Sequence, residues 1–232
     1  MGNVAIGIQA RSTSDRFPRK SLQSILGIPL IAWVIEGCKK VDLPVWVLTS
    51  DDKSDDDLAF ISAEHGAKVF RGSLKNVLCR YKVFVESYGL THVIRINGDS
   101  PLISPDVIMR AVKVSSINAS ADLITNVFPR TFPKGQSVEI IRSTAIKELA
   151  KERMTESNIE HITSFFYDNS RQFQICNFTN NADLSQLNLC VDFPEDLFKI
   201  ERFLKERNIL SPSRIPAWTR LSKLIQANRL GT

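Results

Sequence analysis

Short apolar runs alternate along the chain with stretches in which apolar residues return every three or four positions. The stretch over 77–88, for example, is apolar at 77, 78, 81, 84, 85 and 88, which is the spacing of one helix face. Strands are predicted over residues 4–10, 45–50, 67–70 and 92–96, and helices over 29–37, 55–64, 77–88 and 105–114. This alternation predicts an α/β protein with a Rossmann-like, doubly wound and mainly parallel sheet that has helices on both faces.

The second half of the chain is less regular. Its predicted strands are 122–125, 138–141, 173–178 and 187–191, and its predicted helices are 143–153, a helix capped by Ser157 that ends at 168, and 194–207. We expect a single domain over 1–210 and a basic C-terminal extension over 211–232. Trp218, Leu221, Leu224 and Ile225 have helical spacing in that extension. The predicted helix would pack on its own chain, on a sister subunit or, less plausibly for so short a helix, on a membrane surface.

Composition is that of an ordinary soluble globular protein. The chain has 232 residues, of which 43% are hydrophobic and 24% charged. No apolar run approaches the ~20 residues of a membrane span, and the N-terminus lacks the features of a signal peptide. We therefore expect a cytoplasmic protein. Its four cysteines form no CxxC pair, so buried free thiols are predicted rather than disulfides or zinc ligands.

The net charge of +5 is unevenly distributed. Residues 1–20 carry a net +3 and residues 197–232 a net +6, whereas the segment between them carries −4. A basic surface spread over the whole fold, which is typical of nucleic-acid-binding proteins, is not indicated. We therefore expect no nucleic-acid partner.

The loop after the first predicted strand is rich in cations and hydroxyl groups. Arg11, Arg16, Arg19 and Lys20 lie within ten residues, at the carboxyl end of a strand, where open α/β sheets bind ligands. Such side chains suit a polyphosphate, although the loop has neither the Walker pattern nor GxGxxG. A solvated basic loop is the alternative interpretation.

Two aspartates stand at the ends of other apolar runs. Asp99 follows Gly98 after the run over 92–96, and Asp192 comes just before the helix predicted over 194–207. Either carboxylate alone would be read as a turn or helix cap. Together with the cationic loop, however, they would form a metal–triphosphate site of the kind that nucleotidyl transfer requires.

An ordered series of motifs then resembles one family. Ile8 to Lys20 read I-Q-A-R-x-x-S-x-R-x-P-x-K, the phosphate loop of the sugar-activating cytidylyltransferases. Further matches in the same order include Thr49-Ser50-Asp51, Arg80-Tyr81, Gly98-Asp99, Pro129-Arg130-Thr131, Glu160-His161, and Val191-Asp192 with Pro194-Glu195-Asp196. From about residue 4 to 205 the chain is similar to the acylneuraminate and 3-deoxy-manno-octulosonate cytidylyltransferases. It most resembles the branch for spore-coat polysaccharide biosynthesis. The resemblance implies the nucleotide-diphospho-sugar transferase type of fold.

The resemblance also implies an activity and a set of residue roles. CTP and a small acidic sugar would give a CMP-sugar and pyrophosphate, for surface polysaccharide or glycan synthesis, with Mg²⁺ as cofactor and a homodimer as the assembly. Arg11, Lys20 and Asp99 would be catalytic, and Asp99 and Asp192 would hold the metal. The nucleotide would be bound by Ala10, Arg11, Ser12, Arg16, Lys20, Arg71, Ser73, Arg80 and Asn97, and the acceptor by Glu139, Glu160 and His161.

The chain departs from the family pattern mainly where the acceptor is expected. Arg19 replaces the usual glycine of the phosphate loop, and Ser137 replaces an acid in the usual G-x-D-V-E. The usual R-E-H and T-P-Y read Ile159-Glu160-His161 and Thr163-Ser164-Phe165. An unassigned acceptor is therefore expected. The open alternatives are transfer of another nucleotide or to a different acceptor, such as a sugar or polyol phosphate, and a non-catalytic nucleotide-binding homologue.

Overall fold

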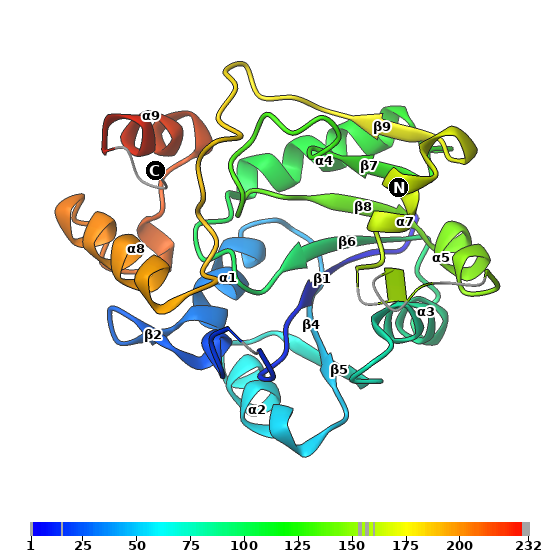
Figure 1. Ribbon diagram of the computed structural model, residues 1–232, viewed down its shortest axis with the longest axis horizontal. Coiled ribbons are helices and arrows are strands. Elements are labelled where there is room, and N and C mark those ends of the chain that lie inside the picture. The colour runs from blue at the N-terminus through cyan, green and yellow to red at the C-terminus, as the bar shows by residue number, and fades with distance from the viewer. Residues whose placement is uncertain (1, 15, 153–154, 156–157, 160, 229–232) are drawn as a thin grey trace.

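A seven-stranded sheet forms the centre of the molecule in the computed structural model, which describes residues 2–14, 16–152, 155, 158–159 and 161–228 (Figure 1). The strand order is β5-β4-β1-β6-β8-β7-β9. β8 runs antiparallel to both of its neighbours, and the other pairs are parallel, so the predicted mainly parallel sheet is confirmed. The strands are β1 (Val4–Gln9), β4 (Val45–Ser50), β5 (Lys68–Gly72), β6 (His92–Asn97), β7 (Leu123–Thr125), β8 (Glu139–Arg142) and β9 (Ile175–Asn177), with a separate hairpin of β2 (Ser24–Ile25) and β3 (Ile28–Pro29).

Helices cover both faces of the sheet. One core contains side chains from α1 (Leu30–Lys39), α2 (Asp56–Glu64), α4 (Pro105–Ile117), α8 (Pro194–Glu206) and α9 (Trp218–Asn228). The other contains side chains from α3 (Val77–Ser87), α5 (Ser143–Leu149) and α7 (Ser164–Asp168), which lie on the opposite side of the sheet in Figure 1. Short 3₁₀ helices occupy Lys20–Leu22, Lys53–Asp55, Ser170–Gln172 and Pro212–Arg214.

Alternate residues of the central strands point into the two cores. In β1, Ile6 and Ile8 enter the first core, whereas Ala5 enters the second. In β6, Ile94 and Ile96 likewise face the first core and Val93 the second. A strand that is buried on both faces reads as a continuous apolar run, which is why the sequence identifies these strands well.

Three predictions in the second half are wrong in detail. The helix predicted to end at 168 is not continuous, because residues 161–163 form a bend and turns and α7 begins only at Ser164. Residues 187–191 form no strand: their only sheet-like pairing is a single bridge between Asn188 and Lys134. This extended segment instead crosses the strand ends, and the Val191 N–H donates to the Asp99 carbonyl at 2.9 Å. The helix predicted over 143–153 ends earlier, at Leu149. The expected cap at Ser157 lies outside the described residues.

The C-terminal helix α9 packs on its own chain. Trp218, Leu221 and Ile225 are buried in the same core as β1, and the Trp218 indole N–H donates to the Asn180 side-chain oxygen at 3.0 Å. The predicted helix is therefore confirmed, and its apolar face is covered by the chain itself. Among the described residues, no helix has the length and apolar character needed to cross a membrane.

The four cysteines are free, as predicted, but they are not all buried. Cys38 is fully buried in α1, and burial raises the pKa of its thiol well above the ordinary range. Cys79 is exposed on α3, so its predicted burial is wrong. Its apolar neighbours Val77 and Leu78 occupy the inner face of that helix, and Cys79 falls on the outer face.

Candidate active site

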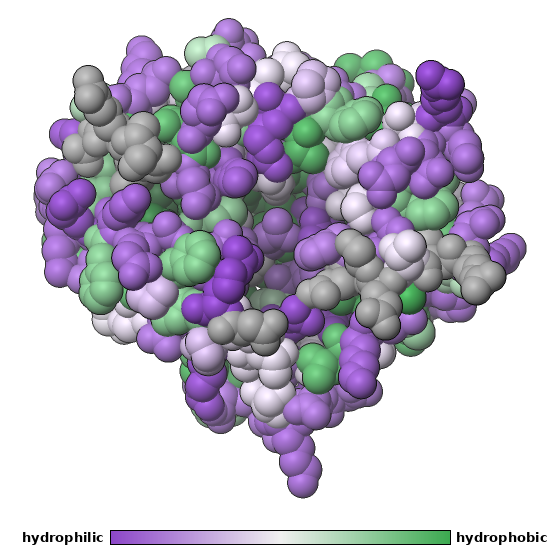
Figure 2. Space-filling view, viewed as in Figure 1, coloured by the Kyte–Doolittle hydropathy of each residue, from purple (hydrophilic) through white to green (hydrophobic). Residues whose placement is uncertain are grey.

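A pocket of about 550 Å³ opens at the carboxyl ends of β1 and β6. Figure 2 shows a hollow near the middle of this face, with hydrophilic residues around it. The lining residues are Gln9, Ala10, Arg11, Ser14, Arg16, Lys20, Ser21, Val77, Arg80, Arg95, Asn97, Gly98, Asp99, His161 and Asp192. The cations among them outnumber the two carboxylates, so the pocket is suited to a polyanionic ligand.

Gly98 allows the two central strands to end close together at this pocket. A Cβ atom at this position would lie 2.7 Å from the Cβ of Ala10 and 3.0 Å from the carbonyl oxygen of Gln9. The Gly98 N–H donates to that same carbonyl at 2.9 Å. Glycine at this position therefore lets the phosphate loop and Asp99 leave neighbouring strands side by side.

The phosphate loop, residues 10–20, is anchored to the sheet by the buried carboxylate of Asp55. Asp55 accepts from the Ser12 N–H at 2.6 Å and from the Ser50 N–H at 3.0 Å. Burial alone would raise the pKa of Asp55, but the hydrogen bonds from Ser50 and Ser12 outweigh it and hold that pKa below the ordinary value. Ser12 therefore acts through its backbone, and its side chain does not line the pocket.

Arg19, near the end of the phosphate loop, has a backbone conformation that favours glycine. Its φ and ψ are 56° and 26°, in the left-handed region, and its N–H donates to the Ser12 carbonyl at 2.9 Å. Arg19 thus adopts a backbone region that glycine reaches at no steric cost. The added guanidinium pairs with Asp57 at 2.6 Å on the exposed surface, away from the pocket lining.

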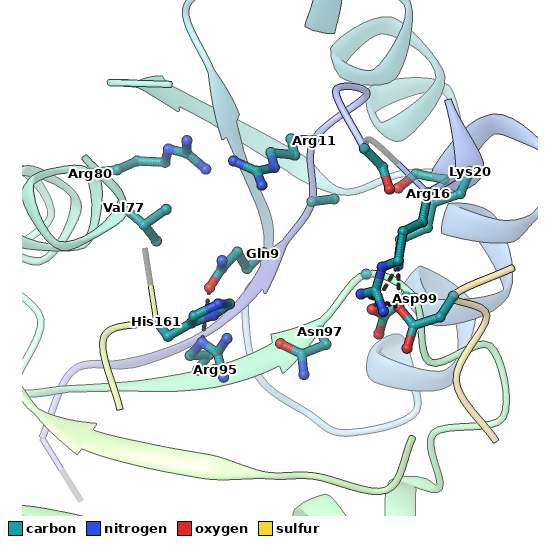
Figure 3. A pocket seen from close by; sticks show the side chains of 15 residues that line it. Gln9, Arg11, Arg16, Lys20, Val77, Arg80, Arg95, Asn97, Asp99 and His161 are labelled. Carbon is teal, nitrogen blue, oxygen red and sulfur yellow. Dashed lines mark hydrogen bonds and ion pairs between the residues drawn. The ribbon is translucent and has the colours of Figure 1, made fainter. Parts of the chain in front are cut away.

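Lys20 brings Asp99, which follows β6, together with Asp192, which precedes α8. Its Nζ lies 3.0 Å from Asp99 Oδ2, 3.2 Å from Asp192 Oδ1 and 3.0 Å from the Val191 carbonyl oxygen (Figure 3). All three N–H donors of the ammonium are therefore used. Burial by itself would lower the pKa of Lys20, but the charges and hydrogen bonds of Asp99 and Asp192 outweigh it and raise that pKa.

These carboxylates also fit a divalent cation. Their oxygens already converge on one cationic group, and Mg²⁺ in such enzymes is held by one or two carboxylates together with substrate phosphates. Among the residues that the structure describes, no three acidic, histidine or cysteine side chains form a complete metal cage. The donor set therefore suits a metal that arrives with a phosphate ligand.

Arg16 and Arg80 lie at two further positions on the pocket wall. Arg16 contacts Asp192 at 3.3 Å, and its guanidinium lies 5.3 Å from the ring centre of Phe193. Arg80 is buried and donates to the carbonyls of Ser73, at 2.7 Å, and Leu48, at 3.3 Å. Burial lowers the pKa of Arg80, because no carboxylate among the described residues pairs with its charge.

Two of the expected nucleotide ligands, Arg71 and Ser73, do not line the pocket. Arg71 donates to the Ser50 carbonyl at 2.8 Å and pairs with Asp56 at 2.7 Å. The Ser73 hydroxyl accepts from the Asn76 N–H at 3.0 Å, at the start of α3. Ser73 thus fixes the start of α3, which carries Arg80, whereas Arg71 ties β5 to the end of β4.

A buried polar network lies at the other end of the pocket. Glu139 on β8 pairs with Arg95 on β6 and accepts from the Tyr167 hydroxyl at 2.5 Å. The Arg95 Nε donates to Gln9 Oε1 at 2.9 Å. Burial, together with the charge of Glu139, raises the pKa of Tyr167 well above its ordinary range, so the phenol remains a donor.

The expected acceptor ligands occupy different positions around that network. Glu139 is 3% exposed and lies behind Arg95, which lines the pocket itself. His161 is exposed and lines the pocket directly, in the same part of Figure 3 as Gln9 and Arg95. Glu160 lies outside the described residues.

Sequence reasoning did not identify three residues that organise the site: Asp55, Gln9 and Tyr167. Asp55 sits in an acid-rich run with Asp51, Asp52, Asp56 and Asp57, and nothing in that run marks which carboxylate is buried. Of the three, Gln9 has a position in the sequence that indicates a role in the site, because it ends the first strand next to the cationic loop.

The fold and the pocket together define a nucleotidyltransferase: an open α/β sheet with a cationic loop and two converging carboxylates at its carboxyl edge. The family model described as cytidylyltransferase matches residues 5–215, and the chain belongs to the cytidylyltransferase family.

Individual proteins agree with this assignment. A solved structure of a cytidylyltransferase from Leptospira borgpetersenii is similar over 98% of this chain and 95% of its own, with a TM-score of 0.92 and 27% identity. The spore coat polysaccharide biosynthesis protein SpsF of Bacillus subtilis is 23% identical over 87% of this chain and 86% of its own. A 3-deoxy-manno-octulosonate cytidylyltransferase of Bdellovibrio bacteriovorus is 29% identical over 58% of this chain and 55% of its own.

Proposed function

We propose that this chain transfers the cytidylyl group of CTP to an acidic sugar, for the synthesis of a surface polysaccharide or glycan. The observation that carries the proposal is the geometry of Lys20, whose ammonium gathers Asp99 and Asp192 within 3.2 Å at the mouth of a cationic loop. The names of the relatives support the sugar acid and the polysaccharide. We also propose, from the resemblance, that the protein is a cytoplasmic homodimer.

In the proposed reaction, an oxygen of the acceptor attacks the α-phosphorus of CTP. A new P–O bond forms, the α–β phosphoanhydride bond breaks, pyrophosphate leaves with that electron pair, and the hydroxyl proton goes to water. Reactions of this kind depend mainly on positioning and on neutralising phosphate charge. Arg11, Arg16 and Lys20 line the pocket where they supply that charge, and the raised pKa of Lys20 keeps it protonated.

Asp99 and Asp192 would hold a magnesium ion in this scheme. When bound, the metal would supply charge neutralisation at the phosphate oxygens. Arg95, fixed by Glu139 and Gln9, and His161 form the pocket end that is left for the acceptor. Asn97 lies between the two ends, on the floor of the pocket.

One screen tests the proposal. The purified chain is incubated with CTP, Mg²⁺ and a panel of 2-keto-3-deoxy sugar acids and sugar or polyol phosphates, and pyrophosphate release is measured. We expect release with at least one sugar acid, and parallel reactions with ATP, GTP and UTP test the base. Release only with phosphorylated acceptors would contradict the sugar acid, and nucleotide binding without release under any condition would contradict catalysis.

A further inference from the structure

Two side chains that line the pocket, Gln9 and Arg95, stand together on neighbouring strands. Gln9 ends β1, and Arg95 lies on β6. Gly7, two residues before Gln9, pairs with Arg95 in the sheet, so the side chains of Gln9 and Arg95 leave the same face. Figure 3 shows them with His161 at the opposite end of the pocket from Lys20. The two residues therefore belong to the end of the pocket that is left for the acceptor.

The orientation of the Gln9 amide is set by Arg95. The Arg95 Nε donates to Gln9 Oε1 at 2.9 Å. Because a guanidinium N–H can only donate, the amide presents its oxygen to Arg95 and turns its NH₂ group away from it. Arg95 is held in turn by Glu139, which also accepts from the Tyr167 hydroxyl at 2.5 Å. Neither the amide nor the guanidinium can therefore rotate without breaking a hydrogen bond.

This arrangement leaves N–H groups of both side chains open to the pocket. Among the described residues, neither Gln9 Nε2 nor Arg95 Nη2 has a hydrogen-bond acceptor. Neither atom is sealed from solvent, and both residues line the pocket, so these donors reach solvent there. The Gln9 oxygen faces Arg95, and a guanidinium has no acceptor. The two side chains therefore offer a ligand donors only.

A ligand group that meets only donors must supply acceptors. A carboxylate has two oxygens that accept and no proton to donate, so it matches an amide NH₂ group beside a guanidinium. In a 2-keto-3-deoxy sugar acid, the carboxylate is bonded to the carbon whose hydroxyl oxygen would attack CTP. Holding the carboxylate would therefore also position the attacking oxygen.

We propose that Gln9 and Arg95 bind the carboxylate of the acceptor sugar acid and so determine the specificity for it. This inference rests on the proposed function and names the residues that select the acid. Glu139 balances the charge of Arg95, so the selection depends on the direction of the donors rather than on surplus positive charge. Gln9→Glu tests this direction, because it keeps an oxygen for the Arg95 Nε and replaces only the NH₂ group.

The test compares the full chain with Gln9→Glu, and Gln172→Glu is the matched control because it makes the same change at an exposed side chain. The KM values of the acceptor and of CTP are measured by pyrophosphate release, with the sugar acid found in the screen and with its neutral amide. We expect Gln9→Glu to raise the KM of the acid at least about tenfold, because a charge-assisted hydrogen bond is replaced by repulsion between two carboxylates. The KM of the amide should rise less, since its own N–H can donate to the introduced carboxylate.

Three results would overturn the assignment. One is an acid KM that stays unchanged in Gln9→Glu, and another is an equal rise for the acid and the amide. The third is a raised CTP KM with an unchanged acceptor KM, which would assign the donors to the nucleotide. Circular dichroism and thermal unfolding of Gln9→Glu establish that the variant is folded.

Binding without turnover separates this inference from the proposed function. Each sugar acid of the panel is titrated into wild type and Gln9→Glu, both saturated with CMP, and the heat of binding is measured. Binding that Gln9→Glu weakens supports the carboxylate site even if no pyrophosphate is released with any acceptor, a result that would overturn the proposed catalysis alone. Binding of equal strength in the two proteins overturns the site and leaves the catalysis intact. Wild-type protein that binds none of the acids overturns the site as well.

Discussion

Removing the carboxylate of Glu139 tests whether this residue supports the fold as well as the pocket. Glu139 is 3% exposed and Arg95 is 8% exposed, and the two form a buried ion pair. Glu139→Ala would leave the guanidinium of Arg95 buried with only Gln9 as a side-chain acceptor. It would also leave Tyr167 without one of its two hydroxyl partners, since Thr125 alone would remain, at 2.9 Å.

The expected loss follows from the burial of the pair. Breaking a buried ion pair by deleting one partner costs about 3–5 kcal/mol, because the other charge stays uncompensated. For a chain of this size about 2–4 °C of Tm is lost per kcal/mol, so Tm should fall by roughly 6–20 °C. Replacing both members, with Arg95→Met and Glu139→Leu together, should recover most of that loss because no charge is left buried.

The assay is thermal and denaturant unfolding of wild type, both single variants and the double variant. Glu139→Gln is the matched control, since it keeps the shape and an acceptor for Tyr167 while removing the charge. A Glu139→Ala variant that loses less than about 1 kcal/mol would refute the reasoning, because an exposed pair is worth no more than that. A double variant as unstable as the sum of the singles would refute it equally.

Substitutions at three further residues have definite expected outcomes. Asp99→Asn should abolish pyrophosphate release while circular dichroism remains that of the folded wild type, with a lower Tm because one ion pair of Lys20 is lost; substantial release would remove Asp99 from the chemistry. Lys20→Met should let Mn²⁺ bind Asp99 and Asp192 without nucleotide, measurable by paramagnetic resonance, because the ammonium no longer occupies their oxygens. The same variant should be less stable than wild type through neutral pH, because the ion pairs of Lys20 are lost. Wild type loses the stability from these ion pairs only as alkaline pH passes the raised pKa of Lys20. A variant whose stability falls at alkaline pH in the same way as wild type would contradict the contribution of the ion pairs. Trp218→Ala should cost about 3–5 kcal/mol, and Trp218→Phe about 1 kcal/mol through the lost hydrogen bond to Asn180, both by denaturant unfolding.

The first half of the fold was predictable because its strands are buried on both faces. Residues 45–50 are buried at every position, so they stand out as an apolar run between amphipathic helices. Residues 187–191 have the same apolar character, and Leu189 and Val191 are fully buried, yet they lie across the strand ends rather than in the sheet. Burial alone does not specify a hydrogen-bonded partner, and the chain has no local signal for one.

The positions of the pocket residues were predictable where these residues directly follow apolar runs, and less so where residues act through hydrogen bonds to others. Asp99, Asp192 and the loop cations follow apolar runs directly, and the topology brings them into one pocket. Arg71 and Ser73 bond to neighbouring backbone outside the pocket lining. The direction of these side chains cannot be predicted from the spacing of residues in the sequence. The buried role of Asp55 depends on the path of the phosphate loop in space, which no run of acids reveals.

The packing of α9 also determines how late in synthesis the core can be completed. Leu221 and Ile225 share one core with Ile6 and Ile8 of β1, although more than two hundred residues separate them. At about 5–20 residues per second, ribosomes need roughly 10–40 s to pass from β1 to α9. During that interval the apolar surface that α9 covers is open to solvent and to other nascent chains. Chaperone demand in the cell should therefore depend on how quickly the last helix follows the sheet.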